Sequence, residues 1–288
     1  ITDASIKAFF PLRGNFPPRV PSPTGTKRRY KELTGKRRRR FTPTPAPRKP
    51  PPPLPSLKSL IDTYNTSYRC RDTLEQGLHL YDHVCGAPTE ASDFKHTMLG
   101  YLEKIAPPFP PKPYQAIVQK RHLNAGESFF FRTDIHGDSR SLIKNLERFR
   151  DQGYLNENFE VVERYKGKIT FVFGGDHGDR GPDTLKVARI LAQFKMLNTK
   201  EVVILKGNHE SIDLTKRYIA EREEGALEES EGYLEAFFNT MPHAILIGGP
   251  ADEKGKRDYA LCLHALIDPR IDLSPAFSDD DGGFYDLS

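Results

Sequence analysis

The sequence predicts an α/β fold built on a parallel sheet. Three short apolar runs favour β-strands, and each leads directly into a polar block that contains Asp, His or Asn. Stretches with helical periodicity separate these runs along the chain. Alternation of strand and helix is typical of a parallel sheet covered by helices. The three strands are expected at Ser128–Arg132, Ile169–Phe173 and residues 202–205.

The first 55 residues differ in composition from the rest of the chain. They hold 13 of the 24 prolines and the basic run from Lys36 to Arg40. Residues 1–60 carry 15 Lys and Arg against 2 acidic residues, a net +13, which leaves −9 for residues 61–288 out of the total of +4. A segment as basic and proline-rich as residues 1–55 has too little apolar surface to offset the entropy cost of folding. We therefore expect a disordered, basic, proline-rich arm over residues 1–55.

This arm has several functional interpretations. A basic run is typical of a nuclear-import signal or of a contact with acidic lipid or RNA, and the polyproline II run at 50–53 is typical of a ligand for proline-recognising domains. A regulatory or targeting partner follows from these interpretations, and a solvated linker is the alternative. The acidic remainder of the chain argues against a nucleic-acid-binding core.

Residues 56–113 are expected to form a helical N-terminal unit. Apolar side chains recur at near-helical spacing over 56–84, and a second helix is expected over 91–105, ended by the prolines of 107–113. His79 and His83 lie four residues apart, a spacing that permits a shared metal on a helix. No third ligand is in phase with them, so we prefer solvated or partly packed histidines.

The main domain is expected to begin at residue 114. Its first strand, Ser128–Arg132, is predicted to be short and buried, and a helix is predicted over 141–152. The next helix should begin at Pro182 and Asp183, because proline suits a first turn and an acidic side chain suits the positive helix end. It should run to about residue 197. Its predicted core face comprises Val187, Ile190, Leu191 and Phe194.

Further elements follow the third polar block. Helices are expected over 213–223 and 232–239, and strands over 244–247 and 260–263. The second of these strands leads into His264. Residues 268–288 resemble the start of further structure.

Cysteine content and hydropathy bear on the cellular compartment in which the chain is expected. Cys70, Cys85 and Cys262 are few and lack metal-type spacing, which fits a reducing compartment better than a disulfide framework. No apolar run approaches the roughly 18–20 residues that cross a bilayer. A cytoplasmic location is expected. Nuclear import through the run Lys36 to Arg40, or delivery into a host cell as a bacterial effector, are the alternatives.

The three polar blocks carry the chemistry. Because the carboxyl ends of adjacent parallel strands meet at one edge of an open sheet, the blocks should lie together. Asp oxygen, His nitrogen and Asn oxygen suit manganese, iron or zinc. Two such ions about 3.5–4 Å apart form a recurrent centre for phosphate ester hydrolysis. The blocks are Asp134-Ile135-His136-Gly137-Asp138, Gly175-Asp176-His177-Gly178-Asp179-Arg180-Gly181 and Gly207-Asn208-His209-Glu210.

These blocks resemble those of the PPP family of metal-dependent protein phosphatases, within the calcineurin-like metallophosphoesterase superfamily. That family has Gly-Asp-x-His-Gly, then Gly-Asp-x-x-Asp-Arg-Gly, then Gly-Asn-His-Glu. The second and third blocks match at every fixed position, and Thr133 replaces Gly in the first. The similarity runs from about Ser128 to Pro275. It implies an α/β metallophosphoesterase-type sheet sandwich flanked by helices, to which residues 56–113 add an extra helical unit.

The resemblance also implies two divalent metal ions, with manganese favoured and iron or zinc as alternatives. Asp134 and His136 would hold the first ion. Asp176 would bridge both ions. Asn208 and His264 would hold the second.

The remaining matched residues would act on the substrate. Asp179 would pair with His209 and keep it protonated for the leaving group. Arg180 would grip the phosphate, aided by Asn208, and Glu210 would help to orient the ligands.

We expect other roles for three further polar residues. His177 stands where the family often has Tyr and is expected to line the site. His243 is expected to begin a strand rather than to bind metal. Asp138 replaces a common Gln and would add negative charge near the ions.

The chain departs from the family after His264. The family continues with Gly-Gly, and this chain has Ala265-Leu266. The family also has a further metal-binding His and a second phosphate-binding Arg downstream, and no His follows His264 here. We expect the domain over 114–288 to be incomplete, with its second sheet and last ligands beyond Ser288. A degenerate second metal site is the alternative.

The implied activity is hydrolysis of phosphomonoesters on protein Ser and Thr by attack of a metal-bridging hydroxide. A phosphoprotein is the implied substrate. A phosphotyrosine or nucleotide-polyphosphate phosphoesterase would use the same metal ligands. A catalytically impaired module that binds phosphopeptides through Arg180 is the non-enzyme alternative.

Overall fold

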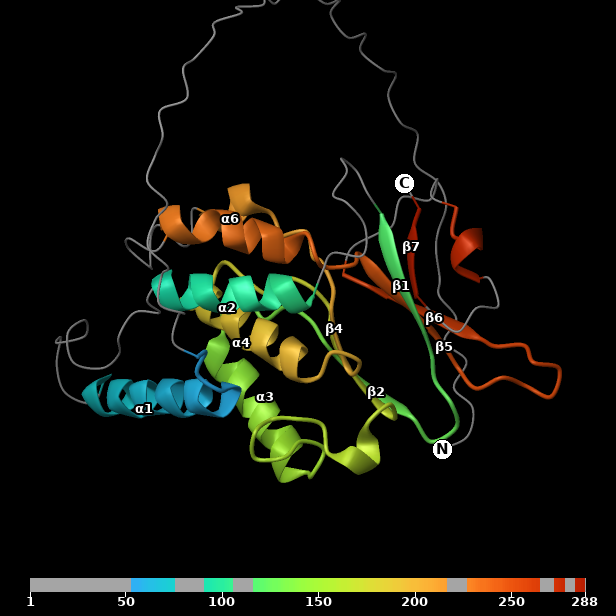
Figure 1. Ribbon diagram of the computed structural model, residues 1–288, viewed down its shortest axis with the longest axis horizontal. Coiled ribbons are helices and arrows are strands. Elements are labelled where there is room, and N and C mark those ends of the chain that lie inside the picture. The colour runs from blue at the N-terminus through green and yellow to red at the C-terminus, as the bar shows by residue number, and fades with distance from the viewer. Residues whose placement is uncertain are drawn as a thin grey trace, which may run out of the picture. The chain divides into compact units, whose positions relative to one another are not determined.

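The computed structural model describes residues 53–75, 91–105, 116–216, 227–264, 272–277 and 283–287. The arm up to residue 52 lies outside these ranges, as do His79, His83, Cys85 and the pair Ala265-Leu266. Within the described residues, strands form two sheets and the labelled α-helices gather on one side of them (Figure 1).

One sheet consists of the three predicted strands. They are β2 (Ser128–Arg132), β3 (Ile169–Phe173) and β4 (Val202–Ile204), all parallel and in the order β2-β3-β4. The parallel α/β arrangement predicted from the sequence is therefore confirmed.

The first of these strands is an edge strand, and the prediction that it is buried was wrong. Phe129 and Phe131 are 41% and 43% exposed, whereas Phe130 packs on Phe149 and Phe171 with ring centroids 4.8 and 5.6 Å away. Among the described residues β2 pairs only with β3. Three consecutive aromatic residues show no alternation, so the sequence could not distinguish a two-faced edge strand from a buried one.

A second sheet of four strands lies within residues 117–286, contrary to the expectation that it would lie beyond Ser288. It comprises β1 (Ile117–His122), β5 (Ala244–Gly248), β6 (Tyr259–Leu263) and β7 (Gly283–Asp286), in the order β6-β5-β1-β7. β1 runs parallel to β5, and the other two pairs are antiparallel.

Strands β1 and β7 of this sheet were not predicted. Only the first two residues of β1 are apolar, which is too short a signal for a strand. Lys120 in its centre is nevertheless only 3% exposed, and its ammonium group lies 5.2 Å from the centre of the Tyr285 ring of β7. The sequence could not show that a lysine would be covered by an aromatic ring from a strand far along the chain.

The two sheets pack face to face through alternate residues of their strands. Val172 and Val203 of the parallel sheet meet Ile245 and Ile247 of the mixed sheet in one apolar cluster. The outer face of the mixed sheet is covered in part by the short helix η2 (Ser274–Phe277), whose Ala276 is 1% exposed. This is the sheet sandwich flanked by helices that the sequence resemblance implied.

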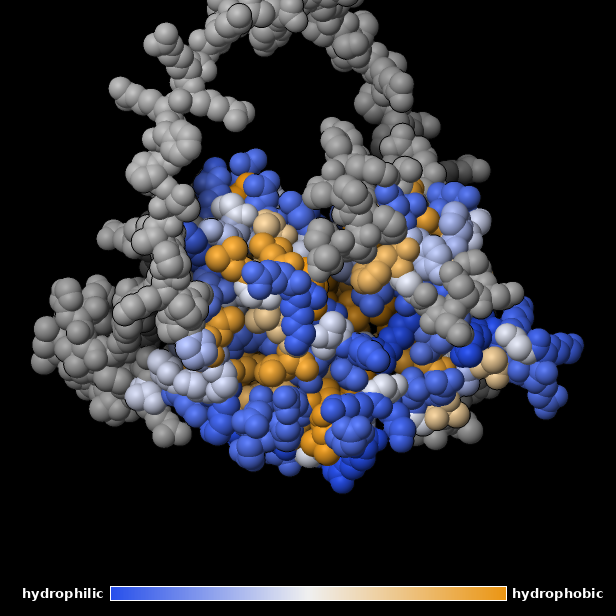
Figure 2. All heavy atoms as spheres, viewed as in Figure 1, coloured by the Kyte–Doolittle hydropathy of each residue, from blue (hydrophilic) through white to orange (hydrophobic). Residues whose placement is uncertain are grey.

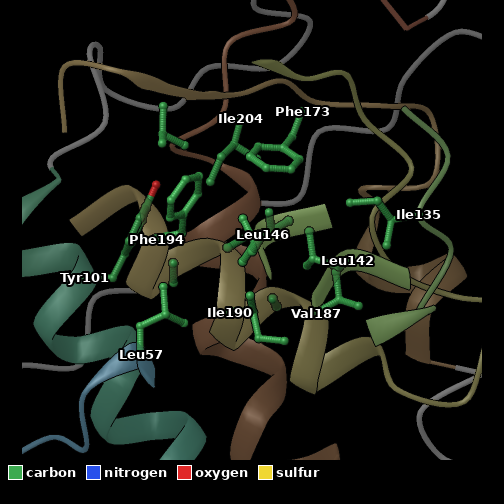
Figure 3. Packing of buried hydrophobic residues seen from close by; sticks show 14 of the residues in the cluster. Leu57, Tyr101, Ile135, Leu142, Leu146, Phe173, Val187, Ile190, Phe194 and Ile204 are labelled. Carbon is green, nitrogen blue, oxygen red and sulfur yellow. The ribbon is translucent and has the colours of Figure 1, made fainter. Parts of the chain in front are cut away.

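The helices cover the other face of the parallel sheet. Figure 3 shows side chains from helices and strands converging there, among them Leu57, Leu146, Phe173 and Phe194. On the face shown in Figure 2, hydrophilic side chains cover most of the coloured surface and hydrophobic ones show in patches. Besides η2, the described helices include α1 (Leu57–Glu75), α2 (Ala91–Lys104), α3 (Ser139–Asp151), η1 (Glu163–Tyr165), α4 (Thr184–Leu197) and α6 (Leu227–Phe238).

Helices α3 and α4 both begin at the polar blocks. Asp138 accepts a hydrogen bond from the Ser141 amide and caps α3, which therefore begins two residues earlier than predicted. Asp183 stands at the start of α4, but its carboxylate binds Ser139 Oγ and Lys186 Nζ rather than a backbone amide. The predicted core face of α4 is confirmed. Each of its members is 0% exposed: Val187, Ile190, Leu191 and Phe194.

Helices α1 and α2 share the apolar core of the α/β elements. Tyr101 of α2 meets the Phe237 ring of α6 edge to face at 5.0 Å, and its hydroxyl lies 2.9 Å from Thr240 Oγ1. Burial raises the pKa of Tyr101 to about 12, so the hydroxyl stays neutral. Arg189 of α4 reaches Asp93 Oδ2 at 3.1 Å in α2. Among the described helices, none combines the length and apolar character needed to cross a membrane.

Candidate metal centre

The three polar blocks follow the carboxyl ends of β2, β3 and β4, and the first two are joined by backbone hydrogen bonds. The Asp134 amide donates to the Gly175 carbonyl at 3.1 Å, and the His136 amide donates to the Asp176 carbonyl at 2.9 Å. The Gly137 amide continues this pairing to the His177 carbonyl at 2.9 Å. The parallel pairing of β2 and β3 thus extends into the blocks and fixes the first block against the second.

Left-handed backbone conformations are concentrated in these blocks. Of the six described non-glycine residues with positive φ, five lie here: Asp134 at 55°, His136 at 47°, Asp176 at 54°, Asp179 at 54° and Arg180 at 52°. Each such residue costs on the order of 1–3 kcal/mol and persists only when its surroundings enforce it. The fold therefore stores strain where the polar side chains converge.

Glycines let the blocks approach each other closely. A Cβ at Gly175 would lie 2.7 Å from the Cα of Gly207, and a Cβ at Gly207 would collide with the side chain and amide of Asp176. A Cβ at Gly181 would collide with the carbonyl of His136. The fixed glycines of the motifs are thus required for the spacing of the site.

Asp176 is the centre of the cluster. Its side chain is 4% exposed, and Oδ2 lies 3.1 Å from His264 Nε2, 3.6 Å from His136 Nε2 and 3.9 Å from His209 Nε2. Oδ1 accepts a hydrogen bond from the His209 amide at 3.1 Å. Three imidazole rings, from three different loops, therefore surround one buried carboxylate.

Asp179 holds two of these rings from the other side. It is fully buried, and its Oδ1 lies 3.1 Å from His136 Nδ1 while its Oδ2 contacts His209 Nδ1. The two rings are perpendicular, with centroids 5.4 Å apart. Because a carboxylate only accepts hydrogen bonds, both Nδ1 atoms carry hydrogen. The Nε2 atom of His136 faces the carboxylates of Asp134 and Asp176.

His264 reaches the cluster from the end of β6 in the mixed sheet. Its Nδ1 lies 3.1 Å from the Gly174 carbonyl and 3.0 Å from Thr133 Oγ1. A carbonyl can only accept, so Nδ1 carries hydrogen, and Nε2 on the other side of the ring faces Asp176 Oδ2 at 3.1 Å. Together with Asp134 and Asp176, this imidazole forms a group whose ligand atoms all lie within 4.8 Å of one another.

Glu210 joins the second block to the third. It is 3% exposed, and its carboxylate accepts hydrogen bonds from the amides of Asp176 and His177, each at 2.8 Å, and from that of Gly207. The expectation was that Glu210 would help to orient metal ligands. Its contacts are with the backbone on which Asp176 stands, rather than with a ligand side chain.

Arg180 and Asn208 lie at the open side of the cluster. The Arg180 side chain is 56% exposed, and its Nη2 lies 3.0 Å from His209 Nε2. A guanidinium group only donates, so this Nε2 accepts and the His209 imidazole is neutral here. Asn208 is exposed, between two residues whose amides bind Glu210 and Asp176.

Two other histidines lie away from this chemistry. His177 was expected to line the site, but its ring is 2% exposed and donates from Nε2 to the Leu205 carbonyl at 2.9 Å. His243 begins β5 as expected: its Nδ1 accepts from the Ile117 amide at 3.2 Å. Burial lowers the pKa of His243, and the charge of Lys206 lowers it further.

The donors at this site fit divalent metal ions. Two ligands at right angles on one ion, with bonds of about 2.0–2.2 Å, lie roughly 3 Å apart. The 3.1 Å between Asp176 Oδ2 and His264 Nε2 is of this size. His136 Nε2 is 3.6 Å from an oxygen of Asp134 and from one of Asp176. Asp176 is therefore shared by two donor groups, as a dinuclear centre requires.

Comparison with known proteins identifies the family. The sequence pattern of the family described as Calcineurin-like phosphoesterase matches residues 128–282, more than half of the chain. The chain belongs to this family. The calcineurin-like phosphoesterases use a dinuclear centre of divalent metals, in agreement with the shared position of Asp176.

Two of the proteins to which the chain is similar are named serine/threonine-protein phosphatases. The chain is 34% identical over 118 residues to serine/threonine-protein phosphatase T of Aspergillus oryzae. The matched residues make up 40% of this chain and 22% of that protein. It is 34% identical over 90 residues to serine/threonine-protein phosphatase 7 of Arabidopsis thaliana, and these make up 31% of this chain and 19% of that protein. The chain thus spans about a fifth of the length of these relatives.

Among solved structures, the chain is similar to a protein serine/threonine phosphatase from Saccharomyces cerevisiae. The sequences are 21% identical and the TM-score is 0.33. The similarity covers 55% of this chain and 44% of the yeast chain.

Sequence reasoning missed part of this calcineurin-like site. Thr133 drew attention only as a departure from the motif, and the Gly174 carbonyl drew none, yet both contact His264. The contact joins the first block to a strand 131 residues later in the chain. The one available signal was that a side chain with a hydroxyl replaces glycine directly before Asp134.

Proposed function

We propose that this chain is a metal-dependent phosphatase that hydrolyses phosphomonoesters on protein serine and threonine. The proposal is carried by one observation: three imidazole Nε2 atoms surround the buried Asp176 carboxylate, with an exposed arginine beside them. The names of the relatives support the substrate class. The membership of the calcineurin-like phosphoesterases supports the reaction type.

Five side chains would hold two divalent ions, of which manganese is the first candidate: Asp134, His136, Asp176, Asn208 and His264. When bound, such ions neutralise phosphate charge and make a water molecule nucleophilic at neutral pH. The protein prepares the site by fixing its ligands in advance. Asp179 and the Gly174 carbonyl each bind the Nδ1–H of an imidazole, which leaves the Nε2 lone pair for coordination.

Arg180 would bind the phosphate group of the substrate. Its guanidinium group donates to His209 Nε2 in the structure, and more than half of the side chain is exposed. A phosphate accepts two parallel N–H bonds from arginine, which a neutral imidazole nitrogen cannot match. Substrate would therefore draw Arg180 away from His209.

His209 would then act as the general acid. Its Nδ1–H donates to the buried Asp179 carboxylate, which stabilises a positive charge on the ring. Once Arg180 has moved, Nε2 is available to carry a proton and to donate it to the leaving oxygen. Proton transfer by a positioned side chain contributes about 10²–10⁴-fold to rate.

Turnover of a set of phosphate esters tests the proposal. Phosphoserine, phosphothreonine and phosphotyrosine peptides and a dinucleotide polyphosphate are each offered to the full chain with added Mn²⁺. We expect turnover of the first two, abolished in Asp176→Asn. The matched control Asp151→Asn should retain full turnover, because Asp151 lies at the exposed end of α3 with its carboxylate on Arg150.

Each other outcome of this assay changes the proposal. A preference for phosphotyrosine or the dinucleotide reassigns the substrate while keeping the metal centre. Absence of turnover in folded, Mn²⁺-loaded protein would favour a phosphopeptide-binding module, whose affinity should then depend on Arg180.

We also infer the domain organisation and partners. Residues 114–288 carry the phosphatase domain, residues 56–113 support it as a helical unit, and the basic arm of 1–55 recruits a regulatory or targeting partner. A phosphoprotein in the cytoplasm is the proposed substrate, which accords with the free thiol of Cys262. Loss of activity on a protein substrate, but not on peptides, after removal of residues 1–52 would support the role of the arm.

A further inference from the structure

We propose that Thr133 is a positioning residue for His264 and that its hydroxyl holds the imidazole ring in the orientation in which Nε2 faces Asp176. The inference rests on the proposed function, because it assigns a metal-binding role to His264. It goes further by giving a role to a residue at which the chain departs from the family motif.

Thr133 lies where three parts of the chain meet. It follows β2 and directly precedes Asp134, and its Oγ1 is 3.0 Å from His264 Nδ1, which follows β6 of the other sheet. The same hydroxyl is 3.5 Å from the carbonyl of Gly174, which follows β3. His264 Nδ1 is itself 3.1 Å from that carbonyl. One hydroxyl, one imidazole nitrogen and one carbonyl thus form a closed polar triangle.

The triangle holds the Nδ1 side of the His264 ring. The Gly174 carbonyl can only accept, so the ring donates to it from Nδ1. The Thr133 hydroxyl lies 3.0 Å from the same nitrogen and shares this hydrogen as a second acceptor, while it directs its own hydrogen to the Gly174 carbonyl. Because Nδ1 is held by two groups, the ring is turned so that Nε2 faces Asp176 Oδ2 at 3.1 Å.

The hydroxyl also limits rotation of the ring. The His264 side chain is 10% exposed, so its neighbours rather than solvent decide its orientation. A threonine is branched at Cβ and has few χ1 rotamers, so its oxygen is held in place. The glycine that occupies this position in the quoted motif has no atom with which to make this contact.

Three substitutions separate the hydroxyl from the volume of the side chain. Thr133→Val keeps the shape and removes the hydroxyl, Thr133→Ser keeps the hydroxyl, and Thr133→Ala removes the hydroxyl with less volume. Thr133 is only partly buried, which favours folding of all three. Thr133→Ala provides a second variant without the hydroxyl if Thr133→Val does not fold.

Two readouts are needed, and the first does not depend on metal or activity. The crystal structure of the metal-free full chain reports the orientation of the His264 ring. We expect Nε2 to face Asp176 in the wild type and in Thr133→Ser, and more than one ring orientation in Thr133→Val and Thr133→Ala, which lack the hydroxyl contact with Nδ1. The second readout is Mn²⁺ affinity. It should fall about 10–100-fold in the two variants without a hydroxyl, as is typical for loss of a group that orients a metal ligand.

The outcomes distinguish this inference from the proposed function. An unchanged ring orientation and unchanged Mn²⁺ affinity in Thr133→Val would overturn the role of Thr133. Equal losses in Thr133→Val and Thr133→Ser would also overturn it, because packing rather than the hydroxyl would then be responsible. If the wild type binds no Mn²⁺, the proposed metal centre fails. In that case the ring orientation alone decides whether Thr133 positions His264.

Discussion

At the scale of single residues, two buried aspartates organise the site in different ways. Asp176 faces the Nε2 atoms of three histidines, where a metal would be coordinated. Asp179 faces the Nδ1 atoms of His136 and His209 and so sets their tautomers. The two carboxylates lie three residues apart in the sequence, and they have different roles because they contact different nitrogen atoms.

Replacement of Asp179 by Asn should therefore impair catalysis more than folding. The amide has a single oxygen, so it can accept from only one of the two Nδ1–H groups and presents a donor to the other. We expect kcat on a phosphopeptide to fall by about 10²–10⁴-fold, the range of general acid–base catalysis. Asp252→Asn is the matched control, because Asp252 is exposed and only accepts from loop amides. A fall in kcat of less than threefold would refute the role of Asp179.

The glycine at position 207 should tolerate no side chain. Its Cβ would collide with Asp176 and would approach the Glu210 carboxylate at 2.7 Å, so Gly207→Ala should destabilise the chain by about 1–3 kcal/mol, as overpacking does. Gly232→Ala is the control substitution for Gly207→Ala. Position 232 lies in α6 with open space around it, and alanine there should stabilise by about 0.5–1 kcal/mol. Urea unfolding measures both. Equal effects of the two substitutions would contradict the close approach of the blocks.

At the scale of secondary structure elements, His243 joins β1 to β5. Its Nδ1 accepts from the Ile117 amide, and its own amide donates to the Ile117 carbonyl at 2.8 Å. The ring must be unprotonated at Nδ1 to accept this bond. The join between the two central strands of the mixed sheet is therefore sensitive to pH.

The direction of the pH effect follows from the lowered pKa of His243. Burial, and then the charge of Lys206, depress the pKa below the value of about 6.5 expected in the unfolded chain. The unfolded chain binds the proton more readily, so this contribution to stability is complete above about pH 6.5 and is lost as the pH falls. We expect the difference in free energy of unfolding between the wild type and His243→Asn to shrink from pH 8 to pH 5. A difference that is independent of pH would show that protonation of His243 does not affect the stability of the chain.

The elements also show which parts of the fold a sequence can predict. α4 was predicted because its apolar residues follow the helical period, and β3 and β4 because each is an unbroken apolar run buried on both faces of the sheet. β1 was missed because its second half, Lys120-Arg121-His122, is polar and is covered by residues distant in the chain. Except for His264, the matched site residues follow three strands of one sheet, so motif spacing located them. Contacts from the other sheet, such as Thr133 with His264, could not be found in this way.

At the scale of the whole molecule, α1 and α2 are built into the core that supports the site. Phe94 and Met98 of α2 are 0% exposed and belong to the same apolar cluster as Leu146 of α3 and Phe194 of α4. Helices α3 and α4 in turn begin at the first two polar blocks. Helices α1 and α2 therefore support the elements that lead from the first two polar blocks.

This arrangement predicts different results for two truncations. A chain that begins at residue 53 should unfold in urea with the same midpoint as the full chain. A chain that begins at residue 116 should fail to fold cooperatively, because removing α1 and α2 exposes the apolar face of α4. Circular dichroism during urea titration checks both. A stable fold for residues 116–288 would show that the helical unit is dispensable.

The most direct test of the metal centre is the number of Mn²⁺ ions bound by the full chain after equilibrium dialysis, measured by elemental analysis. The account predicts about two ions per chain, as in two-metal phosphoesterase sites. Asp176→Asn should bind fewer than one, because this carboxylate is shared by both donor groups. Asp151→Asn should still bind about two. A wild type without bound Mn²⁺, or an Asp176→Asn variant that binds as much as the wild type, would contradict the account.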